Sequence, residues 1–420
     1  AFRNGFLTLD TSYTEGYTDT TNTKTKGSRN HIFAEYDLNL SKDDSYQSDL
    51  ALKIQRVSND TFFRVHNINT ALVNEDNTNL ENKISYNFSN ENMDLNITGA
   101  VYEDLRKNRT DRYEYILPNI LFGKSFFTEK YGALNFSSNA YYKNYDTNSH
   151  TTFLNNDIIW NPESVITKNG FVNTIEGMVN NTNYDAEKTT DYKTEGTINE
   201  LSGVLSFKSS LPLKKMNNKY SNIFSPTFML RFAPGHMRDL HTEDVSLKYS
   251  NLFSTNKTST IEDGLSAILG FDFQKNRLNE EGVEEKKYSI SMGQVFNPEE
   301  NQDLPSKSSL DQKMSDVVGE INYNFSGIGK IDYKFAIDHN FNDINYNEIS
   351  TGFKFGKIGF NLDYLEERNH VGRENYVNAG LTLDINDNNQ LGFKTEKNYK
   401  TDSTEFYDIS YQYANDCLTA

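Results

Sequence analysis

The chain is poor in cysteine, proline and long apolar runs. Its 420 residues include one cysteine, seven prolines and one tryptophan. No stretch approaches the roughly eighteen apolar residues that a transmembrane helix requires, which excludes such a helix. The single cysteine, Cys417, cannot form an internal disulfide, so it is unpaired or has a partner outside this sequence. Helical periodicity is nearly absent, and only residues 308–318 are expected to hold a short turn of helix.

The charge balance is acidic, because 59 Asp and Glu residues outnumber 42 Lys and Arg residues and the net charge is -17. This balance disfavours nucleic acid as a partner, since phosphate binding needs clustered basic side chains. The mean hydropathy of -0.72 suits a soluble or disordered chain, but an aromatic content of 13% argues against disorder. A membrane barrel, a β-sandwich and a β-solenoid all remain compatible with this composition.

The last hundred residues alternate between apolar and polar side chains in blocks of about ten residues. A period of two predicts strands with one apolar face, and about nine to eleven tilted residues cross a bilayer. On the apolar face we expect lipid-facing side chains from Tyr333, Phe335, Phe360, Tyr364, Leu381 and Tyr411. On the polar face we expect lumen side chains from Asp332, Lys334, Asn361, Asp363, Thr382 and Asp384.

The connections between these blocks differ in length on the two sides. Short turns are expected at 327–329, 356–357 and 387–389, and the alternate connections, such as 297–315 and 366–374, are longer. This asymmetry is typical of outer-membrane barrels, which have short periplasmic turns and long external loops. Upstream of about residue 280 the short-turn and long-loop sides cannot be assigned, because two connections, 185–196 and 211–221, both look like loops.

Strand-like blocks continue upstream, with 245–252 among them, and we expect roughly 20–22 antiparallel strands in all. A sheet of that size must curl or close, and closure is compulsory in lipid because every backbone amide needs a partner. The preferred fold is therefore all-β: a large antiparallel transmembrane β-barrel. The chain starts without a leader and stops where a further strand is due, so we expect an incomplete barrel.

No motif in the chain carries chemistry. There is no nucleophile elbow and no phosphate-binding loop, and the acidic pairs lie in expected loops. We therefore expect no catalytic residue, no cofactor, no metal site and no enzyme activity.

One segment, residues 225–239, stands apart from the general pattern because it contains two prolines. Proline is confined to edges, ends and bulges of sheets, so we expect Pro226 to start a strand and Pro234 to end it. This segment resembles part of the barrel of the LptD family, which assembles lipopolysaccharide in Gram-negative outer membranes. The residues that carry the resemblance are Pro226, Leu230, Arg231, Pro234, Gly235, His236, Met237 and Arg238. The ending at 411–418, a Tyr-rich strand running into a turn with Cys417, resembles the same family.

The resemblance implies a translocon that inserts lipopolysaccharide into the outer leaflet, in a barrel of about 26 strands. It implies two protein partners: a plug lipoprotein like LptE, and a periplasmic bridge like LptA that reaches an N-terminal jellyroll. It also implies that Cys417 forms a disulfide with that N-terminal region, which an oxidising periplasm permits. The family has one or two cysteines at this place, and only one is present here.

On this basis residues 1–420 are expected to form one partial barrel domain, without the jellyroll and the last strands. Two alternatives remain open at this point. A general or substrate-specific porin would need no lipoprotein plug and would end in a strand with a terminal aromatic residue. A soluble secreted β-sheet adhesin would pack its aromatic side chains into a core instead of displaying them in a belt.

Overall fold

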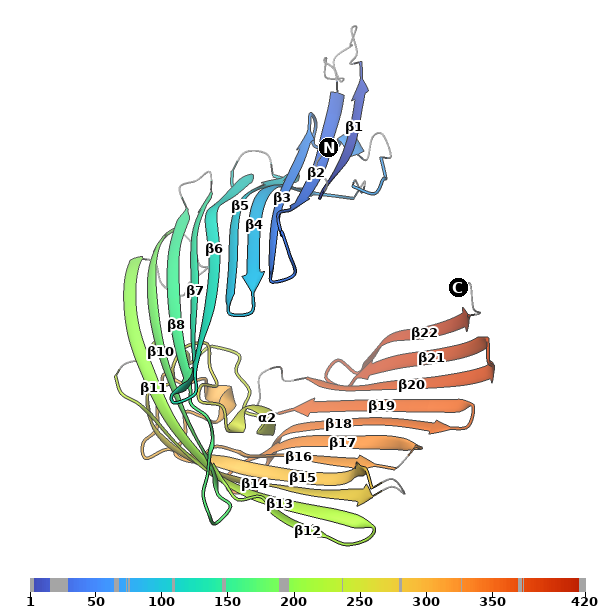
Figure 1. The fold of residues 1–420 in the computed structure, drawn as a ribbon. Coiled ribbons are helices and arrows are strands. Elements are labelled where there is room, and N and C mark those ends of the chain that lie inside the picture. Colours follow the sequence, from blue (N-terminus) through green and yellow to red (C-terminus); the bar gives the residue numbers. More distant parts are fainter. Residues whose placement is uncertain are drawn as a thin grey trace. The chain divides into compact units, whose positions relative to one another are not determined.

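The structure is a computed structural model in which β-strands make up most of the chain. It describes residues 4–15, 29–63, 68–72, 74, 76–107, 110–145, 149–188, 196–235, 237–278, 282–325, 327–368, 372 and 374–414. Within those ranges no helix is both long and apolar enough to cross a membrane. The chain divides into two compact units, one of Ala1–Asn161 with Met178–Leu201 and one of Pro162–Gly177 with Ser202–Ala420. Each unit is described by itself (Figure 1).

The first unit is an antiparallel meander in which each strand pairs with the next along the chain. Its strands are β1 (Gly5–Thr14), β2 (Arg29–Asn39), β3 (Tyr46–Val57), β4 (Asn79–Asn90), β5 (Met93–Asp104), β6 (Tyr113–Thr128), β7 (Gly132–Tyr145) and β8 (His150–Asn161). Residues 178–187 of β10 (Val172–Glu187) and 196–201 of β11 (Gly196–Ser210) also belong to it.

The second unit is a longer meander with the same pairing rule. It holds β9 (Val165–Ile166), the remaining parts of β10 and β11, β12 (Leu213–Met216), β13 (Tyr220–Ala233), β14 (Gly264–Leu278), β15 (Glu284–Phe296), β16 (Val317–Asn324), β17 (Gly329–Ile337), β18 (Ile344–Phe355), β19 (Ile358–Glu367), β20 (Asn375–Asn386), β21 (Asn389–Asn398) and β22 (Ser403–Tyr413). Its helical segments are α2 (Tyr249–Leu252) and a 3₁₀ turn at Ser306–Ser308.

Within the second unit, short and long connections alternate. The short ones are 217–219, 279–283, 325–328, 356–357 and 387–388, and the long ones are 234–263, 297–316, 338–343 and 368–374. The last connection on the long side, 399–402, is no longer than the short turns at 279–283 and 325–328. In the first unit the connections 91–92 and 129–131 are short, whereas 58–78 and 105–112 are longer. The second unit therefore has one rim of short turns and one rim of mostly longer loops, as the sequence predicted for its last third. In the first unit the contrast is weaker, because connection 40–45 on the short side has six residues and 146–149 on the long side has four.

Three expectations are wrong. Residues 245–252 are not a strand, because α2 and its flanks lie inside the long connection between β13 and β14. The helical turn lies at Ser306–Ser308 instead of 308–318, and β16 already begins at Val317. Pro226 lies inside β13, which begins at Tyr220. Pro226 is tolerated there because it lies opposite the break between β11 and β12, where Leu211 donates its N–H to the Pro226 carbonyl at 3.1 Å.

Candidate functional site

The polar face of the second unit carries one apolar row near its long-loop rim. In register, Met229 pairs with Ile268 and Ile268 with Val295, while Val318 pairs with Ala336 and Ala336 with Tyr346. All six side chains are buried. Two loops, 234–263 and 297–316, fold onto this row and cover it with Met237, Leu240, Leu247, Leu252, Leu304 and Leu310. We call these two segments the covering loops.

The first covering loop is tied to the sheet by polar contacts on either side of the apolar row. Helix α2 lies beside β15 and β16 (Figure 1). Its Tyr249 hydroxyl donates to Asp272 at 2.6 Å, and Asp272 also accepts a hydrogen bond from Ser291 at 2.7 Å. Burial and this carboxylate raise the pKa of Tyr249, so its phenol stays a donor. The neighbouring Lys248 lies 5.0 Å above the ring of Tyr346.

Arg231 is the buried anchor of the same loop. Its side chain is 1% exposed and points from β13 to the covered face. Its Nε donates to the carbonyl of Thr255 at 2.7 Å, and Nη2 donates to the carbonyl of Glu262. Thr255 is in turn joined to Ser206 of β11 through their hydroxyls at 2.8 Å. Arg231 and Ser206 together therefore fasten the returning half of the loop to β13 and β11.

The two covering loops are also joined to each other. Leu240 donates its N–H to the Asp303 carbonyl at 2.7 Å, and Asn301 donates to Asp263 at 2.6 Å. A cavity of about 350 Å³ lies between them and the start of β14. Four carboxylates line it, from Glu262, Asp263, Glu299 and Glu300. Among the described residues, no three or more His, Cys, Asp or Glu side chains are grouped so that they could hold a metal ion.

Next to the covering loops, the same face is polar along β17–β20. Ala336 is buried beneath the loops, and Asp332 and Lys334 precede it at steps of two, so they share its face. Leu365 packs against the same cluster, which places Asn361 and Asp363 on this face as well. Thr382 and Asp384 follow from the register, because Asn361 pairs with Gly380 and the polar positions continue at steps of two.

The positions expected to face lipid lie on the opposite face of the same strands. Phe360 pairs with Leu381, and the two side chains are 40% and 46% exposed. Tyr411 is 60% exposed. Phe335 differs, because it is 6% exposed and its ring lies over Gly319 on the neighbouring strand. Phe335 and Tyr333 have their ring centroids 5.5 Å apart. Contact of these side chains with lipid stays a prediction.

The segment 225–239 forms the end of β13 and the entry to the first covering loop. Pro234 follows the last strand residue, and Gly235 has a φ of 123°, which a residue with a side chain rarely adopts. Met237 is buried at 3% exposure beneath the loops. Leu230 points to the other face and is 41% exposed, and Arg238 lies in the covering loop. His236 and Cys417 lie outside the described residues.

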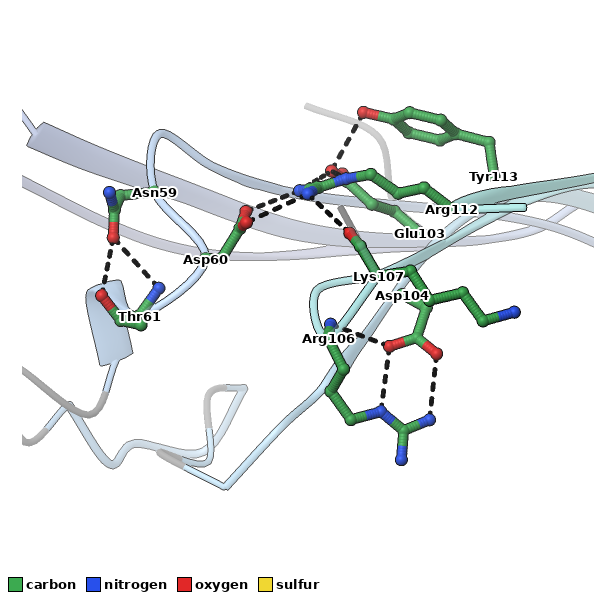
Figure 2. A network of polar contacts seen from close by, with 9 residues as sticks. All are labelled: Asn59, Asp60, Thr61, Glu103, Asp104, Arg106, Lys107, Arg112 and Tyr113. Carbon is green, nitrogen blue, oxygen red and sulfur yellow. Dashed lines mark hydrogen bonds and ion pairs between the residues drawn. The ribbon is translucent and has the colours of Figure 1, made fainter. Parts of the chain in front are cut away.

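The first unit has its own loop folded onto its strands. Residues 58–78 bury Phe62 and Phe63 against Phe33, Leu80 and Leu105. A charged network holds this loop to the next one (Figure 2). Arg112 donates to both oxygens of Asp60 at 2.6 and 3.0 Å, to Glu103 at 2.6 and 2.8 Å, and to the Lys107 carbonyl at 3.1 Å. The Tyr113 hydroxyl also donates to Glu103, at 3.0 Å.

These contacts favour the charged forms of Asp60 and Arg112. The hydrogen bonds from Arg112 hold the pKa of Asp60 below its ordinary value. The same contacts raise the pKa of Arg112, first through its bond to Asp60. The five N–H groups of Arg112 thus have acceptors on three segments: Asp60 in one loop, Lys107 in the other, and Glu103 at the end of β5.

The covering loops were missed by sequence reasoning, because the alternation at 245–252 indicated a strand and residues 297–315 looked like a plain connection. A signal was nevertheless present in the strands. Val318, Ala336 and Tyr346 interrupt the polar side of the alternation at matching positions on three successive strands. An apolar row on a polar face indicates that something packs on it.

A long antiparallel meander with one polar face, one apolar face, one short-turn rim and one long-loop rim defines an outer-membrane β-barrel protein. The chain belongs to the LptD family, LPS transport system D, whose family profile matches residues 28–397. It therefore acts in lipopolysaccharide transport and assembly at the outer membrane, as the sequence resemblance implied.

Solved structures with similar folds are outer-membrane receptors and transporters. The siderophore receptor PirA from Pseudomonas aeruginosa is 9% identical with a TM-score of 0.46, over 99% of this chain and 75% of that one. The copper transporter OprC is 10% identical with a TM-score of 0.36, over 98% and 71% of the two chains. The siderophore receptor PirA from Acinetobacter baumannii is 10% identical with a TM-score of 0.38, over 98% and 74%. No curated protein matches this chain.

Proposed function

We propose that the saccharide part of lipopolysaccharide passes along the polar face of the second unit, which lines the lumen. The covering loops then occupy the part of that face formed by β13–β18. The observation that carries this proposal is the contrast between the two faces of β19 and β20. Asn361, Asp363 and Thr382 offer hydrogen-bonding groups on one face, and Phe360 and Leu381 offer only apolar surface on the other.

Site-specific photocrosslinking in cells tests this assignment. A photoreactive phenylalanine analogue at Asn361 or Asp363 is expected to crosslink to lipopolysaccharide, because the saccharide passes within reach. The same analogue at Phe360, one residue away on the other face, is the matched control and is expected to crosslink to acyl chains of bulk phospholipid. Equal lipopolysaccharide crosslinking from both faces would contradict a route along the polar face.

We also propose that the covering loops restrict the lumen when no substrate passes. Their packing on an apolar row and their anchoring by Arg231 and Tyr249 support a docked resting position. Deleting residues 243–259 should open the lumen to large antibiotics, measured as a fall in the inhibitory concentration of vancomycin. Unchanged resistance in cells with normal amounts of folded protein would show that these loops do not restrict passage.

The remaining proposals rest on the family. A lipoprotein like LptE is proposed to bind within the barrel, and a bridge like LptA is proposed to deliver substrate to an N-terminal jellyroll. Cys417 is proposed to form a disulfide with that jellyroll region, and residues 1–420 are proposed to be one barrel domain of a longer protein. No bond of the substrate is made or broken in this scheme, so the protein acts as a translocon and not as an enzyme.

A Cys417→Ser variant of the full-length protein tests the disulfide. Non-reducing gels should show the loss of one oxidised species, and the LptE-like partner should still copurify if the barrel assembles normally. An unchanged oxidation pattern would remove Cys417 from the pairing.

A further inference from the structure

An aromatic stripe crosses the apolar face of the second unit close to its short-turn rim. Ring centroids lie 5.8 Å apart between Phe273 and Tyr288, and 6.2 Å apart between Tyr288 and Tyr323. The stripe continues through Phe325 and Phe353, whose ring centroids are 5.4 Å apart. Aromatic side chains gather at the level of lipid headgroups in membrane barrels. The stripe therefore marks a membrane–water interface on the short-turn side.

Three lysines, Lys215, Lys275 and Lys287, lie at the β13 end of this stripe, and we call them the lysine cluster. Lys215 pairs with Asn222, and Asn222 pairs with Lys275, which places two of the lysines in one row on one face. The register shifts between Lys275 and Asn276, and such a bulge redirects neighbouring side chains. Lys287 is the residue left unpaired by that shift.

Two of these ammonium groups converge on a single ring. Lys275 Nζ lies 4.6 Å from the centroid of Tyr220, and Lys287 Nζ lies 5.7 Å from the same centroid. Lys275 is also 5.9 Å from the ring centroid of Tyr288. Like charges that converge on one ring repel each other, and a bound anion would offset this repulsion.

The carboxylate of Glu284, which lies nearby, is engaged elsewhere. Lys214, next to Lys215 but on the opposite face, is bound to Glu284 at 2.7 Å, and Glu284 also accepts from Asn276. Glu285 lies opposite Arg277 in the register, one position nearer the turn. Among the residues that the structure describes, no ion pair joins a member of the lysine cluster to a carboxylate. The cluster is thus a local excess of positive charge in a chain of net charge -17.

We propose that the lysine cluster and Tyr220 bind the phosphate of an anionic phospholipid in the periplasmic leaflet of the outer membrane. Lysines near a membrane surface attract anionic headgroups, and tyrosine rings lie at the headgroup level of the membrane. The inference rests on the proposed function, in which the apolar face meets lipid, and on the orientation expected from the sequence, with short turns in the periplasm. It adds a lipid ligand on the outer surface of the barrel, away from the route of the transported saccharide.

Native mass spectrometry of the purified full-length complex, released from vesicles of phosphatidylglycerol and phosphatidylcholine, tests the proposal. The wild type should retain phosphatidylglycerol in preference. The Lys275→Gln/Lys287→Gln variant should bind it roughly 25-fold more weakly, at about fivefold for each ammonium removed. The control Lys214→Gln removes one positive charge from the opposite face and should retain the lipid like the wild type.

Three results would overturn the proposal: equal retention of both lipids by the wild type, unchanged retention in the double variant, or displacement of phosphatidylglycerol by equimolar lipopolysaccharide. If the double variant fails to fold, the salt dependence of lipid retention by the wild type tests the proposal instead. Retention should fall when salt is raised from about 0.05 to about 0.5 M, because exposed charges are screened, and retention that ignores salt would also contradict the site. Lipopolysaccharide crosslinking at Asn361 is independent of this outcome, so failure of the lipid site and failure of the proposed route are distinguishable.

Discussion

The loop of the first unit and the covering loops of the second unit bury apolar side chains in similar ways but are anchored by different chemistry. Loop 58–78 is held by a partly exposed network in which Arg112 meets two carboxylates. The first covering loop is held by a buried guanidinium that meets two backbone carbonyls. Carboxylate partners make an anchor sensitive to salt and strong acid, whereas carbonyl partners make it depend on burial. The loop of the first unit is therefore anchored by ion pairs, and the first covering loop of the second unit by buried hydrogen bonds to carbonyls.

The largest expected effect comes from Arg231→Met. The carbonyls of Thr255 and Glu262 would stay buried without donors, which costs about 3 kcal/mol in the free energy of unfolding. Urea unfolding of the protein refolded into vesicles measures this loss, and hydrogen exchange should rise at residues 254–262. Leu230→Met is the matched control, since Leu230 lies next in the strand but on the apolar face. A loss below about 1 kcal/mol would contradict the assignment of Arg231 as the main anchor.

Arg112→Gln is expected to have a smaller effect, of about 1–2 kcal/mol, because its carboxylate partners are partly solvated. Hydrogen exchange at 58–78 should rise at low salt and differ less from the wild type at about 1 M salt, where exposed charges are screened. The matching experiment on Arg231→Met should show no such salt dependence. If both variants respond to salt alike, the contrast between the two anchors fails.

The stability of loop 58–78 and that of the second covering loop, residues 297–316, should also change with pH in opposite directions. The hydrogen bond from Arg112 lowers the pKa of Asp60, so its contribution is present above its unfolded-state pKa and is lost only as pH falls through the lowered value. Burial raises the pKa of Asp316, which is 5% exposed and accepts a hydrogen bond from Asn345 at 2.8 Å. Its contribution is present below its unfolded-state pKa and is lost as pH rises through the raised value.

As pH falls from about 7 towards the ordinary aspartate pKa of about 4, protection from hydrogen exchange should therefore hold steady in loop 58–78 and increase in residues 309–316. Asp316→Asn should reduce the increase and leave loop 58–78 as it was, and the remaining increase belongs to Asp311, whose pKa burial also raises. The same pH slope in both loops would show that these two carboxyl groups do not control docking.

Arg106→Gln is expected to have the smallest effect on the free energy of unfolding and on loop exchange. Arg106 binds Asp104 through two hydrogen bonds of 3.0 Å, but its side chain is 64% exposed (Figure 2). Exposed pairs contribute at most about 0.5 kcal/mol on average, so unfolding and loop exchange should stay close to the wild type. An effect as large as that of Arg112→Gln would mean that position in the loop matters more than burial.

The strands were predictable because polar and apolar residues alternate, with a period of two, along a strand that has one face in water. Phe360, Leu362 and Tyr364 alternate with Asn361 and Asp363, and the structure pairs β19 with its neighbours in the register that this pattern requires. The rim asymmetry was also predictable, since it depends only on the lengths of connections.

The covering loops were not predictable from periodicity, because their packing depends on contacts distant in sequence. Residues 245–252 have the apolar content of a strand, but they form a short helix whose Leu252 is buried against the sheet. Arg231 was picked out by family resemblance alone, since nothing local distinguishes a buried anchor from a lumen cation. Phe335 was expected to face lipid, which stays a prediction, but its burial was not foreseen: the absence of a side chain at Gly319 leaves room for its ring over the neighbouring strand.

Accessibility scanning along residues 358–367 of β19 in vesicles tests the account most directly. A spin label placed at each position in turn should collide with oxygen, which is soluble in lipid, at Ile358, Phe360, Leu362 and Tyr364. It should collide with a water-soluble nickel complex at Gly359, Asn361 and Asp363. A period of two with these phases is the predicted result. Accessibility that does not alternate, or that alternates with the faces exchanged, would contradict the account.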